Sequence, residues 1–200
     1  MDRRQEKTRQ AIQEALILEI NAHGLHNLTV SSLTKAANIN RATFYLHYDN
    51  IDDLMESIQA DIVHELTQTV DQFNTADLAH NYDDITRLLT DITHLIATHA
   101  DLLSALLGPN GSSSMRITFE QVIANIVSEK MNELPHWARP AHVIVPDNYV
   151  AVMISAIYTS VIWEWFDRGM QESPEAIAQF ISEAGIQPIA NYGLNPFGKS

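Results

Sequence analysis

Residues 29–56 read TVSSLTKAANINRATFYLHYDNIDDLME, and this stretch decides the fold. Thr29 can cap a short helix, because its hydroxyl can accept a hydrogen bond from a free amide of the first turn. Leu33 and Ala37 then follow at helical spacing. Asn38 comes next, and asparagine tolerates the left-handed backbone of a tight turn. The pattern predicts a short helix that ends in a turn at Asn38.

A second short helix is expected directly after this turn. Asn40 is a good N-cap for a helix that runs from Arg41 to about His47. The side chains of this helix that can bond phosphates or base edges are Arg41, Thr43, Tyr45 and His47. Two short helices across such a turn form a helix-turn-helix, whose second helix can lie in the major groove of DNA. A plain corner of a helical protein would show the same spacing.

The rest of the chain also has helical periodicity. Asn50 can cap a third helix over 50–74, with acidic residues in its first turn, where the helix dipole favours them. Further helices are expected over 4–23, 84–98, 101–107, 115–134, 147–169 and 174–184. The sequence therefore predicts an all-α fold of about nine helices. Its domains are expected to be a helix-turn-helix domain over 1–48, with the linking helix 50–74, and a regulatory and dimerisation domain over 75–200.

Charge is distributed unevenly along the chain. Residues 1–48 hold six basic and four acidic side chains, whereas the rest holds six basic and 21 acidic ones, so the net charge is −13. Phosphate contacts dominate DNA affinity, so a cationic N-terminal part on an acidic body suits a DNA-binding head. Both parts could also simply be solvated.

Several function classes find no support in the sequence. Without cysteine there is no disulfide, thiolate nucleophile or Cys-based zinc site. There is no phosphate-cradling glycine loop and no His-Glu-x-x-His motif, so we expect no enzyme, no cofactor and no metal site. The longest uncharged run, 148–163, is shorter than the about 20 apolar residues of a spanning helix. No signal region follows the charged N-terminus, so a cytoplasmic location is expected.

The motif also resembles, as a set, the DNA-binding region of the tetracycline-repressor (TetR) family of bacterial regulators. The matching residues are Thr29-Val30, Ala37, Ile39, Arg41, Thr43-Phe44-Tyr45, His47-Tyr48 and Asp52-Asp53-Leu54. Thr34 departs from the usual alanine and Asn38 from the usual glycine of the turn. Asn50 replaces a lysine that grips phosphate in many members, which suggests a weaker hold on the DNA backbone. The 102–107 segment, its Gly108–Gly111 loop and the Trp163–Trp165 helix resemble a Firmicutes subgroup that includes dihydroxyacetone-kinase regulators.

The resemblance implies a homodimeric repressor that a small ligand releases from a palindromic operator. Expected base contacts are Arg41, Thr43 and Ala42, and expected phosphate contacts are Thr29, Lys35, Tyr45 and His47. Candidates for the ligand pocket are Tyr82, His94, His99, Met115, Phe119, Asn125, Tyr158 and Trp163. The last two helices supply the expected dimer interface, with Val150, Ile154, Ile157, Val161, Trp165, Ile177 and Ile181.

Alternatives to these assignments stay open. Aromatic and methionine residues at helical spacing are often plain core, and the apolar helix over 147–169 could be buried within one chain. Some members of the subgroup respond to a protein partner instead of a ligand. The chain could also be a co-regulator or protein-interaction module with weak or lost DNA binding.

Overall fold

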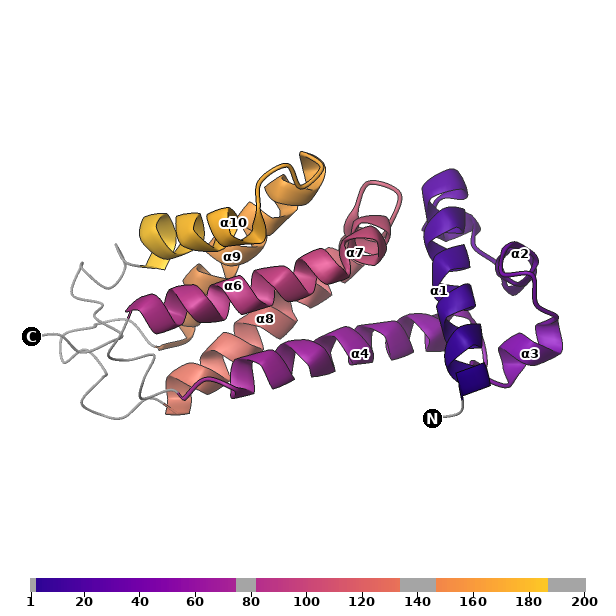
Figure 1. The fold of residues 1–200 in the computed structure, drawn as a ribbon, viewed down its shortest axis with the longest axis horizontal. Helices are drawn as coiled ribbons and strands as arrows, with labels where there is room; N and C mark the ends of the chain where they lie inside the picture. Colours follow the sequence, from indigo (N-terminus) through magenta and orange to yellow (C-terminus); the bar gives the residue numbers. More distant parts are fainter. Residues whose placement is uncertain (1–2, 75–81, 134–146, 187–200) are drawn as a thin grey trace, which may run out of the picture. The chain divides into compact units, whose positions relative to one another are not determined.

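The computed structural model describes residues 3–74, 82–133 and 147–186. Within these ranges it contains nine α-helices and no strand, which confirms the predicted all-α class (Figure 1). The helices are α1 (Arg3–His23), α2 (Val30–Ala36), α3 (Arg41–Tyr45), α4 (Ile51–Asp71), α6 (Tyr82–Thr98), α7 (Ala100–Leu107), α8 (Ser113–Glu133), α9 (Asp147–Asp167) and α10 (Pro174–Phe180). A 3₁₀ turn over Leu25–Asn27 precedes α2, and a π-helical turn over Ile181–Ile186 follows α10.

The contacts divide the chain into two compact units. The head unit comprises Met1–Val63 and His99–Arg116, and the body unit comprises His64–Thr98 and Ile117–Ser200. The head unit thus gains a segment, 99–116, that the sequence-based boundaries assign to the C-terminal domain. The division into 1–48 and 75–200 remains a prediction about functional domains.

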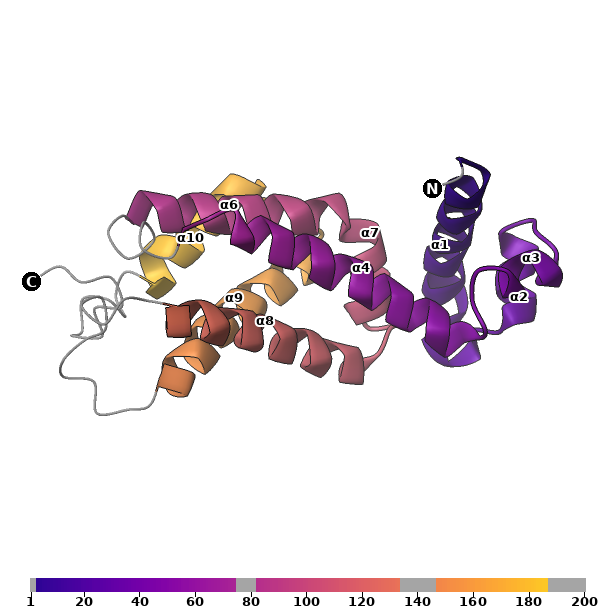
Figure 2. The same ribbon diagram turned by 90° about the horizontal axis from the view of Figure 1, so that it is seen from below.

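The head unit is built on α1. Its apolar side buries Ile12, Leu16 and Ile20 completely, because these residues recur on one helical face. Both α2 and α3 lie on one side of α1 (Figures 1 and 2), and they contribute the fully buried Leu33 and Phe44. This small core fixes the position and orientation of α3 in the head unit.

The loop between α7 and α8 is tied to the end of α1, on which α7 packs. The backbone N–H of Leu25 donates to the carbonyl oxygen of Asn110 at 2.9 Å, and the amide Nδ2 of Asn110 donates to the carbonyl of Asn21 at 3.3 Å. Gly24 ends α1 with a φ of 77°, a conformation that suits glycine. Segment 99–116 is therefore a structural part of the head, joined through the chain to α6 and α8 of the body unit.

In the body unit, α6 and α10 pack against each other, and α8 meets α9 through Phe119 and Trp163, whose ring centroids are 5.6 Å apart (Figures 1 and 2). By length and composition alone, Tyr149–Asp167 of α9 could cross a membrane. However, 44% of its apolar window is buried inside the structure, and core helices of soluble proteins pass the same test. Part of the apolar surface of α9 is thus buried against the chain's own helices, and part of it is exposed in the single chain.

Candidate nucleic-acid interface

The first helix of the motif begins with a capping box. The Oγ1 of Thr29 accepts a hydrogen bond from the N–H of Ser32 at 3.1 Å, and the Oγ of Ser32 accepts one from the N–H of Thr29 at 3.2 Å. The Thr29 side chain therefore fixes the start of α2. A hydroxyl that accepts one bond can still donate its own proton, so Thr29, which is exposed, keeps a donor for a phosphate.

The turn after α2 has the expected left-handed residue. Asn38 has a φ of 53°, which asparagine adopts more readily than most residues. The N–H of Ile39 donates to the carbonyl of Thr34 at 3.0 Å and closes the turn. Thr34 is buried, but its hydroxyl donates to the carbonyl of Val30 at 2.7 Å. The departures from the family pattern at positions 34 and 38 are thus accommodated without an unsatisfied group.

Asn40 caps α3 and orients its first turn. The Oδ1 of Asn40 accepts hydrogen bonds from the N–H of Thr43 at 2.7 Å and from its hydroxyl at 3.0 Å. Thr43 is half-buried, and its hydroxyl donates its proton to this cap. What remains for a contact with DNA is the methyl group and a hydroxyl oxygen that can accept. Arg41 and Ala42 are exposed, and Arg41 makes no side-chain hydrogen bond or ion pair within the described residues.

The far side of α3 anchors it to the head. Phe44 is completely buried and Tyr48 is 7% exposed. The ring of Phe44 meets that of Tyr45 edge to face, with centroids 5.6 Å apart, which holds the tyrosine at the surface. His47 is half-buried and its ring lies 6.1 Å from that of Tyr48. Tyr45 and His47 are therefore placed at the end of α3 by aromatic contacts.

Lys35 occupies an open groove on the head. This groove has a volume of about 520 Å³, and its lining residues are Glu19, His23, Asn27, Ser32, Lys35 and Ala36. Lys35 is exposed and makes no ion pair within the described part of the chain. Its ammonium group is free to meet a phosphate.

Two polar contacts stabilise α4 within the head unit, an ion pair with α1 and a cap at its first turn. Arg9 of α1 forms an ion pair with Asp61 at 2.5 Å, so its guanidinium group already has a partner within the head unit. Burial raises the pKa of the Tyr48 hydroxyl, and the adjacent Arg9 acts against that effect. Asn50 accepts a hydrogen bond from the N–H of Asp53 at 2.9 Å and so caps α4, as its sequence position predicted.

Leu46 is the surface residue of this motif that the sequence reasoning missed. Its side chain is 83% exposed, directly after α3. From the sequence, a leucine next to Tyr45 and Phe44 is expected to be buried, and no local pattern distinguishes it from the buried positions nearby. Only the direction of the helix in space reveals its exposure.

The candidate ligand-pocket residues differ in burial and in their contacts. Tyr158 is buried, with its hydroxyl 3.3 Å from that of Thr93, and burial raises its pKa. Trp163 is buried and donates from Nε1 to the carboxylate of Glu120 at 3.1 Å, while Phe119 is half-buried against it. The other candidates comprise exposed Asn125, half-buried His99 and Met115, and Tyr82, whose side chain lies outside the described residues.

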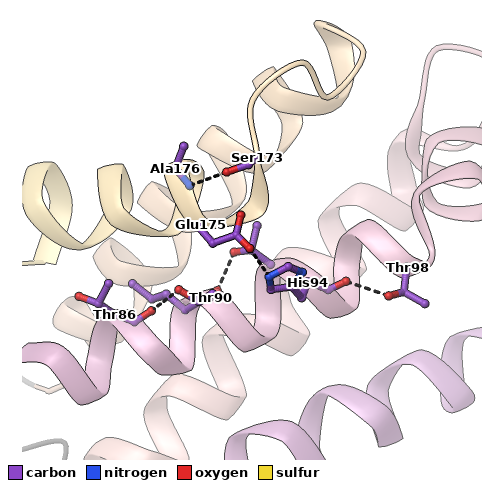
Figure 3. Close-up of polar contacts among 9 residues, drawn as sticks. Thr86, Thr90, His94, Thr98, Ser173, Glu175 and Ala176 are labelled. Carbon is purple, nitrogen blue, oxygen red and sulfur yellow. Dashed lines mark hydrogen bonds and ion pairs between the residues drawn. The ribbon is translucent and has the colours of Figure 1, made fainter.

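His94 is held at the surface of the body unit. Its Nε2 lies 2.7 Å from a carboxylate oxygen of Glu175, which joins α6 to the start of α10 (Figure 3). Both side chains are more than half exposed. Hydrogen bonds from its own backbone N–H, from the Ser173 hydroxyl and from the His94 ring lower the pKa of Glu175. In the single chain, His94 therefore faces solvent.

The candidate dimer residues divide into two groups by burial. Val150, Trp165, Ile177 and Ile181 are buried within the chain itself. Ile154, Ile157 and Val161 are half-buried. The exposed face of α9 is a neighbouring stripe, whose members are Tyr149, Val152, Met153, Ala156 and Ser160. A helix that is apolar on so many sides does not reveal from periodicity which stripe faces outward.

Over the described residues, the chain has a helix-turn-helix head, whose second helix carries an exposed arginine without a partner, and a helical body. This combination is typical of a DNA-binding regulator. The chain belongs to the TetR family of transcriptional regulators. Residues 13–58 match the family of bacterial regulatory proteins named for TetR, and residues 83–185 match a C-terminal region of transcriptional regulators. The resemblance seen in the motif is thereby confirmed.

Individual proteins are similar to this chain in sequence or in fold. An uncharacterised helix-turn-helix transcriptional regulator of Bacillus subtilis (strain 168), YxbF, is 39% identical over 72 residues, which cover 34% of this chain. The match spans only 19% of that relative. The solved structure of the dihydroxyacetone kinase operon activator DhaS matches with a TM-score of 0.62 at 14% identity, over 96% of this chain and 98% of its own. A transcriptional regulator from Pseudomonas aeruginosa PAO1 matches with a TM-score of 0.65 at 15% identity, over 98% and 96%. Both structures share the fold.

Proposed function

We propose that this TetR-family regulator is a cytoplasmic homodimeric repressor, which binds a palindromic operator and leaves it when a small ligand binds. The observation that carries the proposal is the surface of α3. Arg41 is exposed there without a partner within the described residues, while Phe44 anchors the opposite side of the helix. A guanidinium so placed can bond guanine in the major groove in a bidentate manner.

Each candidate contact has a distinct role in this proposal. Arg41, Thr43 and Ala42 read base edges. Thr29, Lys35, Tyr45 and His47 bind phosphates and set the register of the head on the duplex. Asn50 caps α4 with a neutral side chain, whereas a lysine at this position would add affinity for the DNA backbone. The proposal therefore predicts a modest salt dependence for a TetR-type head.

Dimerisation is supported by the exposed apolar stripe on α9. Tyr149 is 64% exposed and Val152 is 59% exposed, and both lie one or two helical turns from exposed Ala156. Phe180 of α10 is 57% exposed. A second copy would cover these residues together with the half-buried Ile154, Ile157 and Val161. The other four candidates, which are buried within the chain, would pack beneath this surface; they are Val150, Trp165, Ile177 and Ile181. Two heads held by symmetry then meet half-sites about 34–36 Å apart.

For the ligand, the aromatic group between α8 and α9 gives the best support among the eight candidates. Phe119 and Trp163 are in ring contact, and Phe166 stacks on Trp163 with centroids 6.0 Å apart. A ligand that separates these rings would favour one conformation of the body over another. It can shift DNA binding only by its differential affinity for the two states.

DNA binding by the purified full chain tests the proposal. Sites are selected from random double-stranded DNA, and affinities are then measured at two salt concentrations beside random DNA. Arg41→Ala should relax sequence preference at one position, by about 1–3 kcal/mol. Lys35→Ala should weaken binding to all sequences and lower the salt slope by about one. Arg168→Ala is the matched control, because it removes an exposed cation from the body unit, where it pairs with Glu172 at 3.8 Å.

Two results would contradict the proposal. Equal effects of Arg41→Ala and Lys35→Ala on selected and random DNA would show that α3 does not read sequence. Absent or salt-insensitive DNA binding would favour the alternative, a co-regulator that acts through a protein partner.

A further inference from the structure

Beside Arg41, the exposed surface of the recognition helix α3 includes an apolar pair, Ala42 on the helix and Leu46 at its C-cap. The backbone N–H of Leu46 donates to the carbonyl of Ala42 at 3.2 Å, so these two residues lie one helical turn apart on the same side. Both are exposed, and Leu46, at 83%, is the most exposed of the large hydrophobic residues in the described part of the chain. Tyr45, at 53%, lies beside them.

A single exposed leucine needs no explanation, because protein surfaces contain many apolar atoms. Leu46 differs because it directly follows the helix that a TetR-type head inserts into DNA, and because Ala42 extends the apolar surface along that helix. Neither side chain can bond a phosphate or donate to a base edge. The apolar group that the major groove offers is the 5-methyl group of thymine.

We propose that Leu46, together with Ala42, recognises the 5-methyl group of a thymine in each operator half-site. This inference rests on the proposed DNA-binding function and specifies what the C-terminal part of α3 reads. Burial of Leu46 against the methyl group removes apolar surface of both partners from water. Arg41 and Leu46 are five residues apart, a rise of about 7.5 Å along the helix. The thymine is therefore expected about two base-pair steps from the base that Arg41 contacts.

Replacement of thymine by deoxyuridine is a direct test, because it deletes only the methyl group. The full chain first selects its site from random DNA, and each thymine of that site is then replaced in both half-sites in turn. At one symmetric position, uracil should lower the affinity of the unaltered protein by about fourfold per half-site, the value expected for one buried methyl group. At other thymines the effect should be smaller.

Leu46→Ala supplies the second half of the test. This variant should bind the thymine site more weakly than the unaltered protein, and it should lose most of the discrimination between thymine and uracil at that position. The matched control is Leu18→Ala, which shortens a leucine that is 64% exposed on α1 and should keep the discrimination. Since Leu46 is exposed, its shortening should leave the melting temperature nearly unchanged.

The outcomes separate this inference from the function on which it rests. If no sequence is selected, both are overturned. If a site is selected but uracil has no effect at any position, or Leu46→Ala discriminates as well as the unaltered protein, the thymine contact is overturned and sequence-specific DNA binding stands.

Discussion

The recognition helix depends on a single amide side chain. Asn40 accepts two hydrogen bonds from Thr43, and α3 is too short to form without tertiary contacts and a cap. We expect Asn40→Ala to lower the free energy of unfolding by about 1 kcal/mol. Affinity for the operator should also fall, by about fivefold. Without its cap α3 is less ordered in the free protein, and part of the binding free energy is then used to order it.

Ser173→Ala is the control for this effect. Ser173 caps α10 in the body unit, where its Oγ accepts a hydrogen bond from the N–H of Ala176 at 3.3 Å. Its loss should cost a similar free energy of unfolding and leave the affinity for DNA nearly unchanged. Denaturation by urea and fluorescence anisotropy on the selected operator measure the two quantities. A similar loss of DNA affinity in both variants would refute a specific role for the Asn40 cap.

A second prediction at the scale of residues concerns alkaline stability. Burial raises the pKa of the Tyr158 hydroxyl above its ordinary value of 10.0. Above pH 10 the unfolded chain releases this proton and the folded chain holds it, so the unfolded state binds fewer protons and stability falls as pH rises. The loss approaches about 1.4 kcal/mol per pH unit. Tyr158→Phe should therefore move the midpoint of alkaline unfolding, followed by circular dichroism, to higher pH.

Tyr45→Phe is the control for Tyr158→Phe, because Tyr45 lies on the surface of the head, where it is 53% exposed. Near neutral pH, Tyr158→Phe should cost about 1 kcal/mol or less, since it loses only the 3.3 Å contact with Thr93. Thr93 retains its hydrogen bond to the carbonyl of Leu89 at 2.6 Å. The prediction is wrong if both variants show the same alkaline midpoint as the unaltered chain.

At the scale of elements, the sequence predicted what local chemistry determines. The caps at Thr29, Asn40 and Asn50 were predictable, because each bond joins residues three positions apart. The left-handed turn at Asn38 was predictable for the same reason. Contacts between distant segments leave no such local pattern. The packing of α7 on α1 was therefore missed, as were the hydrogen bonds of Asn110 with Leu25 and Asn21, which lie 85 and 89 positions away.

The turn between α7 and α8 has almost no room for a side chain at Gly111. A Cβ added there would lie 2.0 Å from the carbonyl oxygen of Leu106, which also accepts a hydrogen bond from the N–H of Ser112 at 2.9 Å. Gly111→Ala must open this turn, and we expect a loss of about 3 kcal/mol in the free energy of unfolding.

Gly169→Ala provides the comparison for Gly111→Ala. Gly169 has a φ of 76° and nothing within 4 Å of its added Cβ, so only backbone strain of about 1 kcal/mol is expected. Urea denaturation measures both variants. Equal losses of free energy of unfolding in the two variants would show that the α7–α8 turn relaxes easily. The hydrogen bonds that join this turn to the end of α1 would then contribute little to stability.

At the scale of the whole molecule, two copies must cooperate for a palindromic operator to be read. If the exposed stripe of α9 is the interface, Ala156→Arg places two arginines against each other across the symmetry axis, in an apolar contact that cannot pair them. The variant should be monomeric by light scattering. Its operator affinity should fall at least about a hundredfold, because the second head no longer binds at a raised effective concentration.

The head offers a control for this change. Leu18→Arg puts the same charge on an exposed leucine of α1, at 64%, and should leave the dimer intact. It should bind DNA at least as well as the unaltered chain, because it adds a cation to the DNA-binding half of a protein whose net charge is −13. A dimeric Ala156→Arg with full operator affinity would place the interface elsewhere. In that case the half-buried Ile154, Ile157 and Val161 would be the next positions to alter, because they are the candidate residues that a second copy could still cover.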